Sequence, residues 1–320
     1  MDHFVSIVVP AYNVANEIED CIQSVQAQTY PNWELLVVND GSTDDTAAKV
    51  EKLSAGDARV RLINQVNRGV STARNTGIKE ARGDYIAFLD GDDLWDPRFL
   101  AELAAAKQRY GVDLVYCGYS RLYHKNVKLG YNYAYADNDV FLAAITGKTQ
   151  IHVGAILVDK KLLTTFDLAF TDGCLVGQDQ EFIIKLAAVA TARSVPKELL
   201  IYRKRAGSAI HSSWNWQKHI HALYGLQRAI VFAAAELKKR QIENYHQEMN
   251  FRLAYKSYKF FWRMIRHGYH DDALRLLTEE KWKTILSHLE LNRLSISDRL
   301  KYSLLGSRNP WLWKLAAKIG

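Results

Sequence analysis

The sequence is poor in cysteine and has no long apolar run. Its 320 residues include only Cys21, Cys117 and Cys174, which are too few and too scattered for a disulfide framework or a zinc site. We expect them to be small buried side chains in a reducing compartment. No stretch approaches the roughly 20 apolar residues that a membrane helix requires, and the first residues lack the basic region of a signal peptide. The sequence therefore predicts a globular protein of the cytoplasm.

Two phosphate-binding motifs are also missing. No G-x-G-x-x-G follows the first apolar run, and no G-x-x-x-x-G-K-[ST] occurs anywhere in the chain. A dinucleotide-binding protein or a P-loop enzyme would need one of these glycine-rich loops to hold its phosphates. The sequence therefore argues against both classes.

Positive charge is concentrated in the C-terminal third. Residues 214–320 contain 19 Lys and Arg against 9 Asp and Glu, whereas the preceding 213 residues contain 23 against 26. The basic residues lie on no recognised nucleic-acid-binding module, and a cluster of aspartates elsewhere would repel phosphate in the absence of metal. We expect no nucleic-acid partner.

Apolar runs alternate with helical periodicity over the first 120 residues. Strands that are apolar on both faces and separated by single helices indicate a mostly parallel sheet with helices on both sides, which is an α/β fold. Ligands of such sheets bind at the carboxyl ends of the strands. The predicted strands are residues 4–9, 34–40, 60–64 and 85–90, and the predicted helices are 14–25, 43–54, 70–81 and a segment after Pro97.

The pattern changes near Trp214, after which long helical stretches follow one another without a low-complexity linker. We therefore expect two domains, an α/β domain at residues 1–213 and a helical C-terminal region at 214–320. The aromatic stripe at residues 255–270 runs around too much of its helix to be a clean membrane face, so we expect it to be core.

Three carboxylates lie within four positions in "YIAFLDGDDLW", directly after a predicted strand. At surface dielectric, two carboxylates about 4 Å apart repel by roughly 1–4 kcal/mol. A hard divalent cation such as Mg²⁺ or Mn²⁺ would offset this repulsion. The alternative is a helix N-terminus, where Asp is favoured by capping and by the helix dipole. The three residues are Asp90, Asp92 and Asp93.

Five blocks of the sequence together resemble a known family. They are "VSIVVPAYN", "VVNDGSTDDT", "NRGVSTARNTGI", "GDYIAFLDGDDLW" and "GQDQEF". Their order and spacing are similar to those of the inverting glycosyltransferases of family 2, which have the Rossmann-like GT-A fold. The resemblance covers residues 4–213 and implies a transferase that uses a nucleotide sugar.

The resemblance implies a nucleotide site and a metal site. Asp40 matches the residue that recognises uracil. A carboxylate suits this role, since it accepts the imide N–H that cytosine lacks. The alternative is that Asp40 forms a turn with Ser42 or Thr43. Arg74 matches an arginine near the nucleotide, against the alternative of a surface helix arginine. The expected nucleotide-binding residues are Pro10, Ala11, Tyr12, Asn13, Asp40, Arg74, Asp90 and Gly91, and the expected ligands of Mn²⁺ or Mg²⁺ are Asp92 and Asp93.

Asp179 in "GQDQEF" matches the catalytic base of the family. An inverting transfer needs one carboxylate that removes the proton from the attacking hydroxyl, while a metal stabilises the diphosphate leaving group. Gln178 stands where the family usually has glutamate, which puts an acceptor contact in doubt. An Asp that caps the following helix is the alternative interpretation.

Two further segments resemble parts of the donor site. "YRKRAGSAIHSS" is similar to a loop that folds over the diphosphate, and it has Arg205 where histidine is usual. Arginine pairs with phosphate but does not ligate a metal, so a metal ligand from this loop is either absent or supplied by His211. The expected diphosphate contacts are Arg205, Ser208 and His211, and the expected donor-sugar or acceptor contacts are His152 and Gln178, of which His152 has an equally good structural interpretation.

The segment "RNPWLWKLAAKIG" predicts a helix with Asn309 as N-cap and Pro310 at its first position. Its apolar face and lysines suit an anionic leaflet. Docking on the catalytic domain or on another subunit, as in a homo-oligomer, is the alternative. The residues of the expected apolar face are Trp311, Leu312, Leu315 and Ile319.

Taken together, the sequence predicts a metal-dependent inverting glycosyltransferase, a hexosyl- or N-acetylhexosaminyltransferase that uses a UDP-sugar. By resemblance to bacterial members, its acceptor is a glycan such as lipopolysaccharide, capsule or a lipid-linked oligosaccharide, reached at the inner face of the membrane. The alternatives are a non-catalytic sugar-nucleotide-binding or scaffold protein and a sugar-nucleotide pyrophosphorylase. The sequence identifies neither the transferred sugar nor the acceptor, and a fold alone does not determine function.

Overall fold

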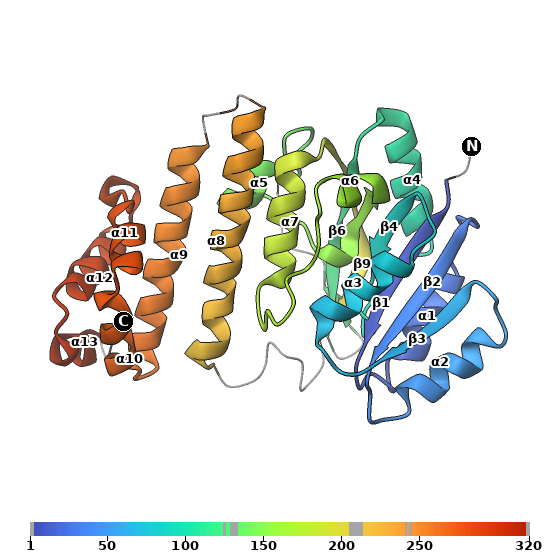
Figure 1. The fold of residues 1–320 in the computed structure, drawn as a ribbon, viewed down its shortest axis with the longest axis horizontal. Helices are drawn as coiled ribbons and strands as arrows, with labels where there is room; N and C mark the ends of the chain where they lie inside the picture. Colours follow the sequence, from blue (N-terminus) through green and yellow to red (C-terminus); the bar gives the residue numbers. More distant parts are fainter. Residues whose placement is uncertain are drawn as a thin grey trace. The chain divides into compact units, whose positions relative to one another are not determined.

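The computed structural model describes residues 3–123, 126–128, 134–204, 214–240, 242 and 245–317. The chain forms two compact units, Met1–Ser213 and Trp214–Gly320. The first unit alternates strands and helices, and the second contains helices only within its described residues (Figure 1).

One sheet forms the centre of the first unit. Its strands, within the described ranges, are β1 (Val5–Ala11), β2 (Trp33–Asp40), β3 (Val60–Gln65), β4 (Tyr85–Phe88), β5 (Leu94–Trp95), β6 (Leu114–Tyr123), β7 (Asn126–Lys128), β8 (Ile156–Asp159) and β9 (Ala192–Arg203). Their order is β3-β2-β1-β4-β8-β6-β9-β5, and β7 pairs with β6. β1 is parallel to β2 and β4, and β2 is parallel to β3. The predicted α/β class and the four predicted strands are confirmed.

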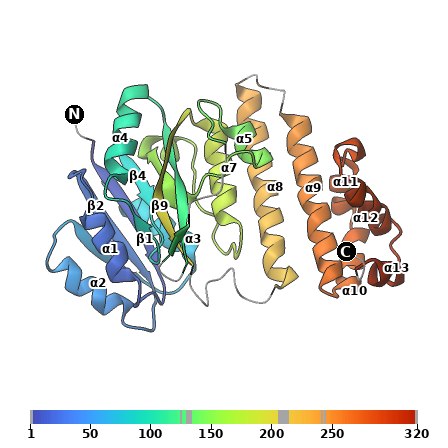
Figure 2. The ribbon, with the colours of Figure 1, turned by 180° about the vertical axis from the view of Figure 1, so that it is seen from behind.

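Helices cover both faces of this sheet (Figure 2). They are α1 (Ile18–Gln26), α2 (Thr46–Ser54), α3 (Val70–Glu80), α4 (Phe99–Tyr110), α5 (Phe141–Thr146), α6 (Lys160–Thr165) and α7 (Gln178–Val189), with a 3₁₀ turn η1 (Val153–Ala155). Apolar residues of α1, α2 and α4 share one buried cluster with alternate residues of the central strands, such as Ile7. On the opposite face, α3 approaches β1 so closely that a Cβ added at Gly77 would lie 2.2 Å from Cγ1 of Val8. Glycine at this position therefore sets the depth at which α3 packs.

The second half of the sheet departs from the parallel pattern. β8 is antiparallel to both of its neighbours, β4 and β6, while β6 and β9 form a long parallel pair whose register shifts at Gly118. The sheet is therefore mixed. The three free cysteines are buried, as the sequence predicts.

The second unit contains the helices α8 (Trp216–Lys239), α9 (His246–Arg266), α10 (His270–Thr278), α11 (Glu280–Ser287), α12 (Ile296–Gly306) and α13 (Pro310–Ala317), with a 3₁₀ turn η2 (Leu291–Arg293). Within the predicted aromatic stripe, Tyr258, Phe261 and Met264 are fully buried, which confirms that it is core. In the described part of the chain, the helices fall short of the length and apolar character that crossing a bilayer would require.

The start of α13 agrees with the sequence, because Oδ1 of Asn309 accepts a hydrogen bond from the backbone N–H of Trp311 at 3.0 Å. The expected apolar face is wrong in one respect. Trp313, which lies outside that face, is fully buried and donates its indole N–H to the Leu304 carbonyl at 2.7 Å. Trp311 remains 68% exposed.

Candidate functional site

The acidic turn after β4 lies against the end of β1. The backbone N–H of Asp93 donates to the Asp90 carbonyl at 2.9 Å and closes the turn. Between them, an added Cβ at Gly91 would lie 3.2 Å from the Pro10 carbonyl. The turn therefore brings the predicted metal residues beside the segment expected to line the base pocket. Since α4 begins only at Phe99, the aspartates do not cap a helix.

Arg74 of α3 connects the acidic turn to α7. Its Nη2 donates to Oδ1 of Asp90 at 2.6 Å and its Nη1 to Oδ1 of Asp179 at 2.5 Å. The side chain is only 1% exposed, so the surface-arginine alternative is wrong. Burial lowers the pKa of Arg74, but the two carboxylates outweigh burial and raise it. The same contact with Arg74 outweighs burial at Asp90 and lowers the pKa of that carboxyl.

Asp179 lies in the first turn of α7, which begins after Gly177. Gly177 is the N-cap residue and has no side chain with which to cap this end of the helix. The carboxylate of Asp179 points instead to Arg74, which does not support the capping alternative. Because 41% of the side chain remains exposed, the carboxylate is oriented by the protein and still open to a substrate hydroxyl.

Asp93 is enclosed beneath the turn. Its Oδ1 accepts a hydrogen bond from the backbone N–H of Arg203 at 2.8 Å, and the residue is 0% exposed. Its Oδ2 is buried without a hydrogen-bond partner among the residues described. Burial and the neighbouring Asp90 and Asp92 raise the pKa of Asp93 well above its usual range. A cation bound at the turn would relieve this crowding of negative charge.

The turn has the chemistry of a site for a hard cation. Within the described ranges, no three His, Cys, Asp or Glu side chains form a ready set of metal ligands. A cation held by one or two carboxylates and by substrate phosphates does not need such a set. Asp92 is partly exposed, and Asp93 has a buried oxygen without a partner. These oxygen ligands fit Mg²⁺ or Mn²⁺ bound together with a diphosphate.

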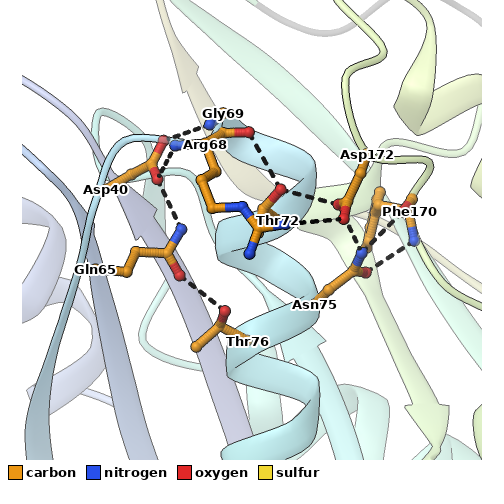
Figure 3. A network of polar contacts seen from close by, with 9 residues as sticks. All are labelled: Asp40, Gln65, Arg68, Gly69, Thr72, Asn75, Thr76, Phe170 and Asp172. Atoms are coloured by element: carbon orange, nitrogen blue, oxygen red, sulfur yellow. Dashed lines mark hydrogen bonds and ion pairs between the residues drawn. The ribbon is translucent and has the colours of Figure 1, made fainter.

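Asp40 is held by the loop between β3 and α3 (Figure 3). Its Oδ1 accepts hydrogen bonds from Nε2 of Gln65 at 2.7 Å and from the backbone N–H of Arg68 at 2.9 Å, and its Oδ2 accepts from the N–H of Gly69 at 2.8 Å. The residue is 3% exposed. A carboxylate has about four lone-pair positions, so three protein donors leave room for one more. The preceding residue, and not Asp40, forms the expected turn, since Oδ1 of Asn39 accepts the N–H of Ser42 at 3.1 Å.

One exposed ring directly follows β1, whose last residues are Pro10 and Ala11. Pro10 and Ala11 are buried, whereas Tyr12 is 48% exposed. Asn13 has a φ of 51°, and its Oδ1 accepts the N–H of Thr43 at 2.8 Å. This bond ties the ends of β1 and β2 together. Tyr12 is therefore placed at the strand ends, where a base can pack on its ring.

His152 has a structural contact and also lies near the charged residues. Its Nδ1 accepts the N–H of Gly154 at 3.0 Å and caps η1, so Nε2 carries the proton of the neutral ring. Burial lowers the pKa of His152; Asp90 and Asp179 oppose this effect, and the positive charge of Arg74 adds to it.

Other predicted contacts are less informative. Gln178 has a buried Oε1 with no hydrogen-bond partner among the described residues, which leaves an acceptor beside Asp179. Arg205, Ser208 and His211 lie outside the described residues.

The end of β9 lies against the acidic turn, a contact that the sequence does not predict. Tyr202 precedes Arg203, which contacts Asp93, and burial together with the charges of the acidic turn raises the pKa of Tyr202 to about 12. Arg203 also pairs with Asp20 at 3.1 Å. Both residues begin the segment "YRKRAGSAIHSS", whose resemblance to the diphosphate loop points to its later residues only.

Comparisons with known proteins show which proteins this chain is similar to. Residues 6–158 match the family described as "Glycosyl transferase family 2". The chain is 34% identical over 170 residues to "UDP-Glc:alpha-D-GlcNAc-diphosphoundecaprenol beta-1,3-glucosyltransferase WfgD" of Escherichia coli, which is 53% of this chain and 65% of that protein. It covers less than two thirds of the length of the first curated relatives it matches.

Solved structures show the same fold. TarS 1-349 of S. aureus in complex with UDP-GlcNAc has a TM-score of 0.71 and 20% identity, over 98% of this chain and 90% of that one. A mannosyltransferase, PcManGT of Pyrobaculum calidifontis, in complex with GDP-Man and Mn²⁺, has a TM-score of 0.56 and 18% identity, over 100% of this chain and 87% of that one. The expected GT-A fold is thereby confirmed.

Proposed function

We propose that this protein transfers a sugar from a nucleotide-diphosphate donor to a hydroxyl of a glycan, as the match of its residues 6–158 to glycosyl transferase family 2 suggests. The observation that carries the proposal is the bridge from Asp90 through Arg74 to Asp179. It sets a partly exposed carboxylate beside a turn suited to a metal diphosphate. This is the arrangement that glycosyl transfer with one general base requires.

The proposed donor is a UDP-sugar. Asp40 retains one lone-pair position after its three protein hydrogen bonds, and the imide N–H of uracil is a donor that fits it. One relative is a UDP-Glc transferase and one structural neighbour was solved with UDP-GlcNAc, and both support a uridine nucleotide. Tyr12 is the proposed ring on which the base packs. The other proposed nucleotide-binding residues are Pro10, Ala11, Asn13, Asp40, Arg74, Asp90 and Gly91.

Asp179 is the proposed general base. Arg74 holds Oδ1 of its carboxylate, so the acceptor hydroxyl would give its proton to the other oxygen as it attacks the anomeric carbon. The bond to the diphosphate breaks from the opposite side, and the configuration inverts. No covalent intermediate on the protein is needed.

Mn²⁺ or Mg²⁺ is the proposed cofactor. Asp92 and the free oxygen of Asp93 would hold the ion, and the bound ion supplies charge stabilisation to the leaving diphosphate. The Mn²⁺ complex of a structural neighbour supports this choice. Arg74 does not take part in metal binding, since a guanidinium has no lone pair to offer.

The proposed acceptor is a surface glycan or a lipid-linked oligosaccharide, supported by the diphosphoundecaprenol in the name of a relative. Such an acceptor lies at a membrane surface, and we propose peripheral contact through α12 and α13. Ile296 and Leu300 of α12 are 78% and 62% exposed, and Trp311 of α13 is 68% exposed. Residues 291–317 contain five basic residues and one acidic residue, which favours an anionic leaflet.

The test is Asp179→Asn, measured by calorimetric titration and by turnover with a panel of UDP-sugars. Asparagine keeps a hydrogen bond with Arg74 but accepts no proton, so donor binding is expected to persist while turnover is lost. Equal turnover would remove Asp179 from the role of base. Donor binding without turnover in both proteins would instead favour the non-catalytic sugar-nucleotide binder, which needs Asp40 and Asp92 but not Asp179.

A further inference from the structure

The side chain of Asn75 is bonded at both ends to the backbone of one distant residue. Its Nδ2 donates to the Phe170 carbonyl at 2.8 Å, and its Oδ1 accepts the Phe170 N–H at 2.9 Å. Next to this pair, Oδ1 of Asp172 accepts from the hydroxyl of Thr72 at 2.9 Å and from Nδ2 of Asn75 at 3.3 Å (Figure 3). α3 therefore fixes residues 170–172 by a set of directional bonds.

The ring of Phe170 touches each element that carries the Arg74 bridge. It stacks on Phe182 of α7, with centroids 4.1 Å apart and planes at 11°, and meets Phe88 of β4 edge to face at 5.4 Å. The guanidinium of Arg74 lies 5.0 Å from the ring centroid. Phe182 is one helical turn after Asp179, and Phe88 is two residues before Asp90. A shift of this 2% exposed ring would move the carboxylates that Arg74 joins.

The first turn of α7 depends on such support. It starts after Gly177, whose φ is 88° and which has no side chain to cap it. An uncapped helix start has unsatisfied N–H groups and frays more readily. The contacts from Phe170 to Phe182 and from Arg74 to Asp179 therefore hold this turn from outside the helix.

We propose that Asn75 is a positioning residue: by fixing Phe170, it sets the orientation of the Asp179 carboxylate toward the reacting hydroxyl. This inference rests on the function proposed above. Asn75 itself makes no contact with the substrate in this role. Its effect reaches Asp179 through the Phe170 ring, Phe182 and Arg74.

The neighbouring residue provides a matched control. The hydroxyl of Thr76 donates to Oε1 of Gln65 at 2.8 Å, and Gln65 in turn donates to Asp40. Two adjacent residues of α3 thus support opposite sides of the site, Asn75 the base and Thr76 the uracil-binding carboxylate. Their replacement should separate turnover from donor binding.

The experiment compares wild type with Asn75→Ala, Asn75→Ser, Thr76→Val and Asp179→Asn. Hydrogen exchange followed by mass spectrometry needs no ligand, and UDP release from UDP-glucose and UDP-GlcNAc reports turnover. Replacing Asn75 by alanine or serine is expected to speed exchange at least ten-fold in peptides covering residues 168–183. It should slow UDP release about ten-fold or more, because small misplacements of a reacting group are costly, with the Kd for UDP within two-fold of wild type.

Thr76→Val is expected to affect the other side of the site. It should weaken UDP binding and speed hydrogen exchange at residues 65–69, and it should leave exchange at residues 168–183 unchanged. Unchanged exchange at 168–183 in both Asn75 variants would overturn the inference. Normal UDP release in them, beside an inactive Asp179→Asn, would overturn it as well. If Asp179→Asn releases UDP as fast as wild type, the proposed base is wrong, and the exchange data then show support of α7 without a catalytic consequence, which also overturns the inference.

Discussion

Arg74 and Asp179 are 105 residues apart in the sequence and are joined by a hydrogen-bonded ion pair of 2.5 Å at the carboxyl ends of the strands. The arginine is buried and its second amine is bonded to Asp90. One side chain thus fixes the distance between the proposed base and the acidic turn. A side chain that joins two such groups affects both stability and turnover.

Replacing Arg74 should therefore be severe. Arg74→Gln leaves two carboxylates facing each other without a cation, and we expect a loss of about 3 kcal/mol of unfolding free energy, the lower end for a broken buried pair because both carboxylates are partly exposed. Arg74→Lys keeps the charge but not the fork that reaches both partners, and should be intermediate. Urea unfolding and UDP-sugar turnover measure the two effects.

Arg98→Gln is the control for that series. Arg98 pairs with Asp96 on the surface, and its side chain is 60% exposed. Its loss should change stability less than either Arg74 variant and leave turnover intact. If Arg74→Gln were as stable and active as Arg98→Gln, the bridge would have no role in the site.

The metal assignment predicts a specific effect of Asp92→Asn. Mn²⁺ should strengthen UDP binding to the wild type, and the variant should lose at least ten-fold of that gain, because the ion joins a carboxylate to the diphosphate. Without metal, the two proteins should bind UDP alike. Asp96→Asn is the matched control, since Asp96 directly follows β5, close to the turn in sequence, but is bonded to Arg98. Equal Mn²⁺ dependence in all three proteins would contradict the assignment.

The fold up to residue 90 could be predicted because its central strands are apolar runs buried on both faces, as in β1 and β2. The later strands carry weaker signals. β9 places exposed residues such as Lys197 and Glu198 within its length, and β8 has only four residues. Their antiparallel and parallel pairing depends on tertiary packing, which periodicity does not encode.

The candidate site was predicted residue by residue but not as an arrangement. Motif positions identify Asp40, Arg74 and Asp179, yet nothing in local sequence says that Arg74 is bonded to Asp179 rather than to a nucleotide. An arginine that binds a protein carboxylate and one that binds a nucleotide can stand at the same position of a helix. Asn75 stands next to Arg74 in the same motif, and only its bonds to Phe170 reveal a role for it.

Acid should weaken one local contact in a defined pH range. Hydrogen bonds from Arg59 lower the pKa of Asp57 to about 2, below the unfolded value near 4. The charged form is thus favoured by folding, so its stabilisation is present above about pH 4 and is lost as the pH falls toward 2. Because Arg59 is 43% exposed, we expect a contribution of no more than about 1 kcal/mol.

Urea unfolding of wild type and Asp57→Asn at pH 6, 4 and 3 measures this effect. The wild type should be the more stable protein at pH 6, and the difference should shrink at pH 3. Arg59→Gln should show the same trend, since it removes the donor groups that favour the ionised carboxyl. A difference that stays constant from pH 6 to pH 3 would exclude the ion pair as its cause.

Membrane contact through α12 and α13 predicts that single polar replacements reduce vesicle binding. Leu300→Ser and Trp311→Ser each remove an apolar side chain that is more than half exposed, and neither is expected to disturb the core. Lys301, Arg308 and Lys314 have no acidic partner among the residues described, so they are available to lipid phosphates. Each basic residue near an anionic surface contributes about 1 kcal/mol. Binding to phosphatidylglycerol vesicles should thus exceed binding to phosphatidylcholine vesicles and decrease with salt.

Val231→Ser is the matched control, because Val231 is 65% exposed on α8 and lies outside the basic residues 291–317. Vesicle sedimentation should show weaker binding for Leu300→Ser and Trp311→Ser and wild-type binding for Val231→Ser. Equal binding by all four proteins would refute the contact. A change of oligomer size in the two α12–α13 variants, without a change in vesicle binding, would assign the exposed side chains to an interface between copies of the chain, because the same apolar groups stabilise either kind of contact.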